Sequence, residues 1–364
     1  MYNLESIADD QATFRACVAT KEPYKPLYVK IKLTWRCNLH CQMCNYWRQE
    51  RHNALSPELL RTIVDELAEL GCGKIHLSGG EPLLHEDLFE LIEYMAAKGM
   101  RVNLTTNGTL LTREKAERLA ASGVKSISVS IDSPEARIHD RIRAKGAWKR
   151  TIKGLRNLRR AIRKARTKTK IRLNTVISRT NYESLAALPD LGQEVGTNSL
   201  TLIPVDDPEG RLLLNKRRIR DYNERIAPVI ASQGLEYGLL DSEREAYPFG
   251  IKKAEIEQSK KGWYALGLYD EQPCYAPWTH ALITPSARVY ACCMTRGMPK
   301  PLGNLLEAPF TDIWQGETYR AFRVRMHGPP LEICRHCDDF LDQNRYLHSL
   351  VADGSAIERA QQAS

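Results

Sequence analysis

Six short stretches between residues 28 and 204 alternate hydrophobic with polar residues, and a longer stretch with apolar residues three or four positions apart follows most of them. The first pattern has the period of a β-strand and the second that of an amphipathic helix. The strand candidates are YVKIKLT (28–34), KIHLS (74–78), RVNLTT (101–106), KSISVSI (125–131), IRLNTVI (171–177) and SLTLIP (199–204).

The first helix candidate has clear ends. Ser56 and Pro57 suit a cap and a first turn, Leu59 and Ile63 begin an apolar face, and Gly71 ends it. Six strand–helix units in series predict a parallel sheet with right-handed crossovers. We therefore expect an α/β fold, a partial (β/α)6 TIM-like barrel.

The pattern changes after the last of these strands. Residues 206–262 indicate a charged, helix-rich linker, and residues 263–345 are rich in aromatics, prolines and cysteines, with a hairpin over 280–284 and 288–293. We expect five parts: an N-terminal extension (1–27), the barrel (28–205), the linker, a small C-terminal auxiliary domain (263–345) and a polar, helical tail (346–364).

The chain contains ten cysteines, and their role depends on the cellular compartment of the protein. No run of about 18 uncharged apolar residues predicts a membrane span, and the first fifteen residues are too polar for a secretory signal. These features favour the cytoplasm, where disulfides do not persist and clustered cysteines bind metal or carry chemistry. Seven of the ten form two groups with ligand-like spacing.

Positive charge is concentrated in one segment. Residues 137–172 contain sixteen Lys and Arg and one acid, although the whole chain has a net charge of only +9. Within it, the apolar residues fall on one helical face. The segment is either a solvated outer helix or a docking face for an acidic partner. Nucleic-acid binding is not expected, because no aromatics are interleaved as stacking platforms.

The first cysteine group is Cys37, Cys41 and Cys44, directly after the first strand. In parallel barrels the active site lies on loops at the carboxyl ends of the strands. Three thiolates can bind three irons of a [4Fe–4S] cluster and leave the fourth iron open. A zinc site completed by His40 is the alternative, although zinc usually takes paired ligands.

The spacing C-x3-C-x2-C at this position resembles the signature of the radical S-adenosylmethionine (SAM) superfamily. The resemblance implies a SAM-binding [4Fe–4S] cluster and SAM itself as cofactors. It places Gly79, Gly80, Glu81 and Pro82 at the methionine end of SAM, where Glu81 would accept from its ammonium group. Met43 stands where the family usually has an aromatic residue beside the adenine. The further cofactor contacts that the resemblance implies are Asn107, Ser130, Asp132, Arg143 and Asn174.

The second cysteine group is Cys274, Cys292, Cys334 and Cys337. Its order resembles the SPASM/twitch branch of the same superfamily, and the spacing is similar to that of 2-deoxy-scyllo-inosamine dehydrogenase. This implies one auxiliary [4Fe–4S] cluster with four thiolate ligands. Cys293 could replace Cys292 as the ligand, and a structural zinc ion is the alternative occupant.

The resemblance implies an oxidoreductase, most simply of the dehydrogenase type. Such an enzyme reductively cleaves SAM to a 5′-deoxyadenosyl radical, which abstracts hydrogen from the substrate. The auxiliary cluster then oxidises the substrate radical. We expect a small-molecule substrate, a hydroxylated metabolite, and a low-potential electron donor such as flavodoxin or ferredoxin. No catalytic side chain is identified.

Three other functions stay open. A SPASM-type peptide maturase would crosslink or epimerise a peptide, but 27 residues before the barrel are too few for a leader-peptide recognition domain. A radical SAM decarboxylase is a second alternative. The third is a non-catalytic protein that binds iron or zinc and scaffolds a partner.

Overall fold

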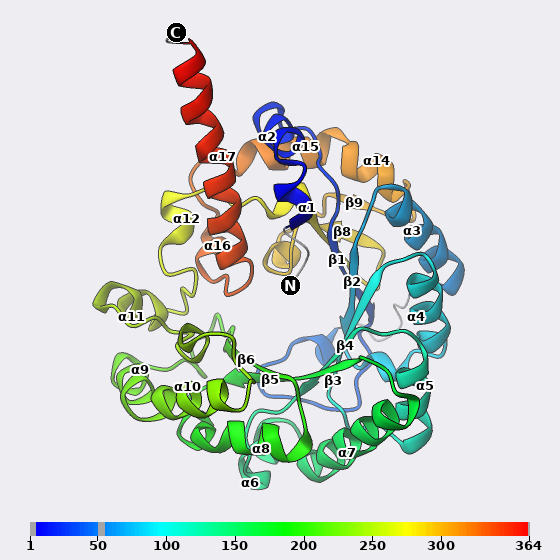
Figure 1. The fold of residues 1–364 in the computed structure, drawn as a ribbon, viewed down its shortest axis with the longest axis vertical. Helices are drawn as coiled ribbons and strands as arrows, with labels where there is room; N and C mark the ends of the chain where they lie inside the picture. The colour runs from blue at the N-terminus through cyan, green and yellow to red at the C-terminus, as the bar shows by residue number, and fades with distance from the viewer. Residues whose placement is uncertain (1–4, 50–54, 363–364) are drawn as a thin grey trace.

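One sheet of nine strands organises the molecule (Figure 1). The structure is a computed structural model that describes residues 5–49 and 55–362, the last ten of these by their backbone alone. The strands are β1 (Tyr28–Thr34), β2 (Lys74–Gly79), β3 (Arg101–Thr106), β4 (Ser126–Ser130), β5 (Lys170–Ile177), β6 (Ser199–Pro204), β7 (His280–Ile283), β8 (Arg288–Tyr290) and β9 (Gly303–Asn304). Their order across the sheet is β6-β5-β4-β3-β2-β1-β7-β8-β9.

The first six strands are parallel and confirm the six strand predictions. Helices cover the outside of this arc (Figure 1): α3 (Pro57–Glu69), α4 (Leu88–Ala97), α5 (Arg113–Ala121), α6 (Ala136–Ile142), α7 (Ala147–Ala165) and α8 (Leu188–Val195). Helix α3 begins as expected, since the Ser56 side chain accepts from the Leu59 N–H at 3.2 Å. The partial TIM-like barrel is confirmed.

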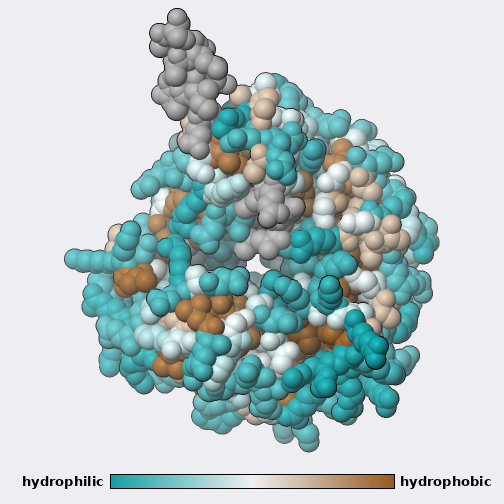
Figure 2. All heavy atoms as spheres, in the orientation of Figure 1, coloured by the Kyte–Doolittle hydropathy of each residue, from teal (hydrophilic) through white to brown (hydrophobic). Residues whose placement is uncertain are grey.

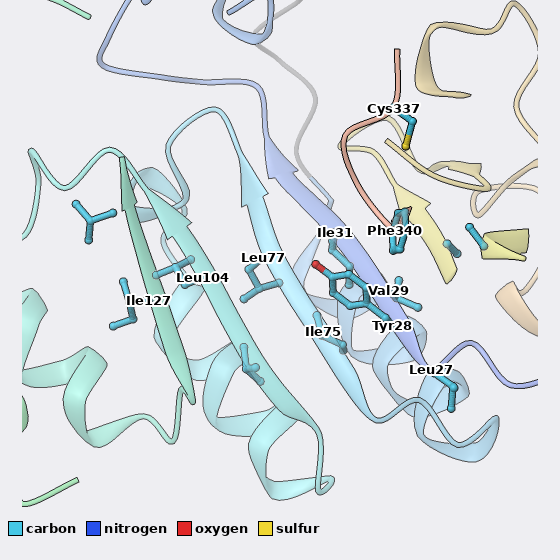
Figure 3. Close-up of a cluster of buried hydrophobic side chains, with 14 of the residues drawn as sticks. Leu27, Tyr28, Val29, Ile31, Ile75, Leu77, Leu104, Ile127, Cys337 and Phe340 are labelled. Carbon is cyan, nitrogen blue, oxygen red and sulfur yellow. The ribbon is translucent and has the colours of Figure 1, made fainter. Parts of the chain in front are cut away.

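Strand alternation separates an apolar outer face from a polar inner face. Ile31, Leu77 and Leu104 are completely buried between the strands and the helices (Figure 3). Each such side chain stabilises the fold by about 1.5–3 kcal/mol relative to an exposed one. The alternate positions on β1 and β2 are instead polar, among them Lys32 and Ser78, which are register partners. Polar side chains therefore line the inside of the barrel.

The auxiliary domain extends the same sheet. Strand β7 runs parallel to β1, and β8 and β9 continue as antiparallel neighbours, so the predicted hairpin is confirmed. The segment that follows Cys337 also returns to β1, where the rings of Phe340 and Tyr28 lie 6.3 Å apart (Figure 3). The two cysteine groups are thus linked through a single strand.

Short helices make up the rest of the described chain. Between the barrel and β7 lie α9 (Lys216–Asp221), a π-helical turn at Tyr222–Ile226, α10 (Ala227–Glu236), α11 (Lys253–Ser259), α12 (Leu268–Glu271) and α13 (Ala276–Thr279). After β9 come α14 (Phe310–Gln315), α15 (Glu317–Arg325), α16 (Glu332–Arg335) and α17 (Leu341–Gln362). Short 3-10 helices lie at Tyr46–Arg48, Pro82–Leu84, Tyr182–Ala187, Glu243–Ala246 and Met294–Gly297. Among the described residues, no helix has the length and apolar character needed to cross a membrane.

The N-terminal helices α1 (Glu5–Ala8) and α2 (Gln11–Thr20) pack against the C-terminal part of the chain. The indole N–H of Trp278 donates to the Cys17 carbonyl at 3.1 Å, and that of Trp314 donates to the Tyr24 carbonyl at 3.1 Å. Arg15 donates to the Leu350 carbonyl of α17. The segment before the barrel is therefore part of the packing around the auxiliary domain.

Candidate active site

The first three cysteines lie on the loop that leaves β1, at the carboxyl end of the barrel strands. Each of their sulfurs receives one N–H donor: Asn107 Nδ2 lies 3.9 Å from Cys37 Sγ, Arg143 Nη1 lies 3.9 Å from Cys41 Sγ, and the Tyr46 backbone N lies 3.4 Å from Cys44 Sγ. Such donors stabilise thiolates that bind metal. The donor set therefore fits an iron–sulfur cluster with three protein ligands.

Burial raises the pKa of Cys41 to about 11, and the neighbouring Arg143 opposes this rise. Burial likewise raises the pKa of Cys37. Metal binding requires deprotonated thiols, so the positive charge of Arg143 favours the ligand form of Cys41.

Gly79 and Gly80 hold the cysteine loop against the end of β1. The Gly80 N–H donates to the Thr34 carbonyl at 2.7 Å, and the Glu81 N–H donates to the Arg36 carbonyl at 2.8 Å. A Cβ on Gly80 would lie 2.1 Å from the Arg36 oxygen, and Gly79 has φ +133°. Both positions require glycine, because the two backbones touch here.

The Glu81 side chain is fully buried and bonded within the protein. Its Oε1 accepts from the Leu83 N–H and the Thr106 hydroxyl, and its Oε2 accepts from the Asn107 N–H at 2.8 Å. Pro82 starts the short helix that presents Leu83. The carboxylate thus joins the ends of β2 and β3 and orients Asn107 toward Cys37, a role that the sequence did not indicate.

Asp132 and Arg143 form a buried ion pair. Arg143 Nε and Nη2 donate to the two Asp132 oxygens at 2.6 and 3.0 Å, and Asp132 also accepts from the Val176 N–H. Asp132 is 0% exposed and Arg143 8% exposed. The carboxylate raises the pKa of Arg143 further, so the guanidinium stays charged beside Cys41. The sequence placed these two residues at SAM, and the structure places them against each other and the cysteine loop.

Three other predicted contacts line or adjoin the barrel interior. Ser130 and Asn174 are register partners on β4 and β5. The Asn174 side-chain oxygen is buried, and no described residue donates a hydrogen bond to it. An unsatisfied buried acceptor fits a ligand with hydroxyl groups at this level of the barrel. Met43 packs with Leu39, Cys41 and Ala147, beside the cysteines.

The second cysteine group is enclosed in the auxiliary domain. Cys292 and Cys334 help to raise the pKa of Cys274, and Cys292 and Cys274 help to raise that of Cys337. The four thiols are therefore close enough to influence one another. Burial raises the pKa of Cys334 to about 12 and that of Cys337 well above its ordinary value. The set offers four thiols, of which those of Cys334 and Cys337 are buried and those of Cys274 and Cys292 are partly exposed.

The adjacent Cys293 has different electrostatic neighbours. Its charge acts on Lys30 and Tyr28 of β1 rather than on the other cysteines of the group, except for its neighbour Cys292. This arrangement supports Cys292 as the fourth ligand. The remaining cysteines, Cys17 and Cys72, lie apart from both groups, and the Cys72 thiol donates to the Lys74 carbonyl at 3.4 Å.

The spacing of the thiols bears on the choice of metal. Among the described residues, no three His, Cys, Asp or Glu side chains converge as closely as a single metal ion requires. A tetrahedral zinc ion holds all its ligands within about 2.0–2.3 Å of the metal. The thiols of both groups are the ligand type that iron–sulfur clusters take.

Two sequence profiles match the chain. Residues 31–181 match the radical SAM superfamily, and residues 274–338 match an iron–sulfur cluster-binding domain of the SPASM type. The matched segments contain all seven cysteines of the two groups. The two domains imply a SAM-binding [4Fe–4S] cluster, auxiliary cluster binding and SAM as cofactors, as expected from the resemblance.

Curated relatives extend over most of the chain. The AdoMet-dependent heme synthase of Methanosarcina barkeri is 29% identical over 316 residues, which are 82% of this chain and 85% of the relative. The mycofactocin maturase MftC of Mycolicibacterium smegmatis is 27% identical over 317 residues, 86% of this chain and 76% of the relative. Among solved structures, Streptococcus suis SuiB bound to S-adenosylmethionine superposes with a TM-score of 0.66 at 18% identity, covering 92% of this chain and 77% of SuiB. This last likeness is one of fold.

Gly80→Ala should lower the iron content of the reconstituted protein at least about twofold, because the new methyl group displaces the cysteine loop. Iron and sulfide analysis measures the effect. Gly297→Ala is the control, since its Cβ would meet no atom within 4 Å. Equal iron in the two variants would refute the contact between the loops.

Asp132→Asn should destabilise the protein by about 3–5 kcal/mol, because it leaves the buried Arg143 without a counter-charge. Chemical unfolding of the reconstituted protein measures the loss. Asp342→Asn breaks an exposed pair with Arg345 and should change stability by less than about 1 kcal/mol. A similar, small effect in both variants would contradict the buried pair.

Proposed function

Because the chain is a radical SAM enzyme with a SPASM-type cluster-binding domain, we propose that it oxidises a substrate held inside the barrel. When bound, SAM and the first cluster would supply a 5′-deoxyadenosyl radical as the hydrogen acceptor, and the auxiliary cluster would supply the acceptor for one electron, with one proton released to solvent. Cys37, Cys41 and Cys44 would hold the first cluster. Cys274, Cys292, Cys334 and Cys337 would hold the second.

The observation that carries the proposal is the set of N–H donors to the first three sulfurs. Asn107, Arg143 and the Tyr46 backbone each serve one thiol, and no described His, Asp or Glu completes a fourth ligand for a single ion there. A three-thiolate cluster keeps one iron accessible to SAM. The Gly79–Glu81 loop and the inward-facing Ser130 and Asn174 are the residues we assign to SAM.

The second group supports oxidation rather than substrate ligation. Four enclosed thiols leave no open coordination position, so this cluster would transfer electrons. Its domain continues the barrel sheet through β7. The four cysteines of the second group thus lie in a domain that is joined to the barrel by strand pairing.

The barrel interior supports a polar substrate. Ser128 and Ser199 are both register partners of Arg172, and Lys32 faces Ser78. Hydroxyl and cationic groups in an enclosed space select hydrogen-bonding ligands. A small hydroxylated metabolite remains our first choice of substrate.

A peptide maturase is the second candidate. It is favoured by the similarity to a mycofactocin maturase over 317 residues and by the fold shared with SuiB, which has also been solved with its precursor peptide SuiA. The two functions differ in the compound that stimulates 5′-deoxyadenosine formation. A panel that includes metabolites and peptides separates them.

Helix α7 is the surface we assign to the electron donor. Its first residue, Ala147, packs against Cys41 and Leu39 of the cysteine loop. Lys149 and Arg150 on its first turns are exposed. Figure 2 shows mainly hydrophilic residues, with hydrophobic ones among them, at the lower right, where Figure 1 places α7. An acidic flavodoxin or ferredoxin docked here would lie close to the first cluster.

Cys41→Ala should abolish reductive SAM cleavage, because it removes a ligand of the cluster that binds SAM. Cys334→Ala should retain cleavage and lose product oxidation. Chromatographic assay of 5′-deoxyadenosine and of the product distinguishes the two. Formation of 5′-deoxyadenosine by Cys41→Ala, at the rate of the unaltered enzyme, would refute the assignment of the site.

Lys149→Glu should slow flavodoxin-driven SAM cleavage roughly three- to tenfold at low ionic strength, because it reverses a charge on the docking surface. Cleavage driven by dithionite should not change. Lys300→Glu, an exposed lysine of the auxiliary domain, is the control and should affect neither rate. A slower reaction with both reductants would mean that the variant damages the site itself.

A further inference from the structure

Positive charge gathers on the inner face of the barrel, below the level of the cysteine loop. Lys30 and Lys32 on β1, Lys74 on β2 and Arg172 on β5 all occupy inward positions of their strands. Lys30 is neutralised, since its ammonium group pairs with the Asp339 carboxylate. The other three have no such partner among the described residues.

Their contacts leave the charges uncompensated. Lys32 lies over the Tyr46 ring at 4.9 Å, and Lys74 lies over the Tyr28 ring at 4.6 Å. Arg172 donates to the Ser199 hydroxyl at 3.1 Å. Lys32 is 8% exposed and Lys74 7% exposed, so solvent does not screen them well.

The cations converge on one region. The imidazole of His76 lies at its centre, bonded to the Tyr28 hydroxyl and the Thr105 hydroxyl, each at 2.7 Å. Burial lowers the pKa of His76 well below its ordinary value, and the charges of Lys30, Lys32, Lys74 and Arg172 lower it further. Burial and the neighbouring cations also lower the pKa of Lys74 to about 8.

Two acids approach this space from the auxiliary-domain side without cancelling the excess. Asp206 interacts with His336 and Arg296. Asp338 is next to Asp339 in the chain, and of these cations it is Lys30 whose charge lowers its pKa. Two further carboxylates act on the set, Asp339 on Lys74 and Glu245 on Arg172, but among the described residues neither forms an ion pair with that cation.

Buried lysines without a counter-ion are costly, and proteins rarely keep them unless a bound group supplies the charge. The level of the charges is also informative. Ser128 and Arg172 are register partners two residues before Ser130 and Asn174 on the same strands, and the latter pair are residues we assign to SAM. A group bound at Arg172 would lie one layer of side chains below the residues we assign to SAM.

The geometry points to an anionic substrate: a compound with two or more carboxylate or phosphate groups, held by Lys32, Lys74 and Arg172 inside the barrel. This inference rests on the proposed function, because it takes the barrel interior as the substrate site. Arg172 can bind such a group through two parallel N–H donors, and the lysines act as point charges.

Binding can be tested without the radical reaction. Anaerobic calorimetry of the reconstituted enzyme with SAM, and without a reductant, would use three probes: propane-1,2,3-tricarboxylate, its uncharged trimethyl ester and fructose 1,6-bisphosphate. We expect one or both anions to bind and the ester not to bind. The tighter anion identifies the acidic group as carboxylate or phosphate.

Lys32→Met and Arg172→Met should each weaken binding of the anion about tenfold or more. Lys168→Met is the matched control, because this lysine is exposed at the end of the basic segment and reports anion binding to the surface. It should change affinity less than about twofold. Iron content and circular dichroism establish that each variant is folded and loaded.

Three results would overturn the inference: no binding of either anion to the unaltered enzyme, equal binding of acid and ester, or unchanged affinity in Lys32→Met and Arg172→Met. The proposed function fails in a different way. If the anions bind as described but the unaltered enzyme forms no 5′-deoxyadenosine with dithionite, the radical chemistry is wrong and the anion site stands.

Discussion

The contact between two backbones at the end of β1 is the constraint on which the site depends. Gly80 and Glu81 donate to the carbonyls of Thr34 and Arg36, so the cysteine loop cannot move independently of β2. Through the Glu81 carboxylate, the same contact extends to Asn107 at the carboxyl end of β3. Three strands thus fix the direction of the first thiol. A loop held only by its own residues could not present three sulfurs to a rigid cluster.

The sequence predicted the scaffold well because the scaffold follows local rules. Alternation predicted all six barrel strands, a Ser-Pro pair predicted the start of α3, and cysteine spacing predicted both groups. The roles of Glu81 and Arg143 could not be predicted, since each depends on a partner that only the fold brings near: the Asn107 N–H, and Asp132 with Cys41. The contacts of both residues with SAM stay predictions, whereas their contacts within the protein left no signal in the sequence.

Neighbouring residues set another limit on prediction. Cys292 and Cys293 are adjacent, so no spacing rule separates them, whereas in the fold Cys292 acts on Cys274 and Cys337, and Cys293 acts on Lys30. The segment before the barrel was expected only as an extension. Its packing depends on hydrogen bonds from Trp278 and Trp314, more than 250 residues away along the chain. Contacts at that separation leave no local pattern.

The polar interior distinguishes this barrel from one that encloses only a core. In an ordinary closed (β/α)8 barrel, layers of branched apolar side chains fill the centre. Here six strands leave one side of the arc to the auxiliary domain, and the inward positions carry lysine, arginine, serine and threonine. Such a lining gains nothing from hydrophobic burial, so its stability must come from the helices outside and from ligands inside. The polar side chains inside the barrel therefore contribute little hydrophobic stabilisation, and the same side chains make the interior suitable for binding a ligand.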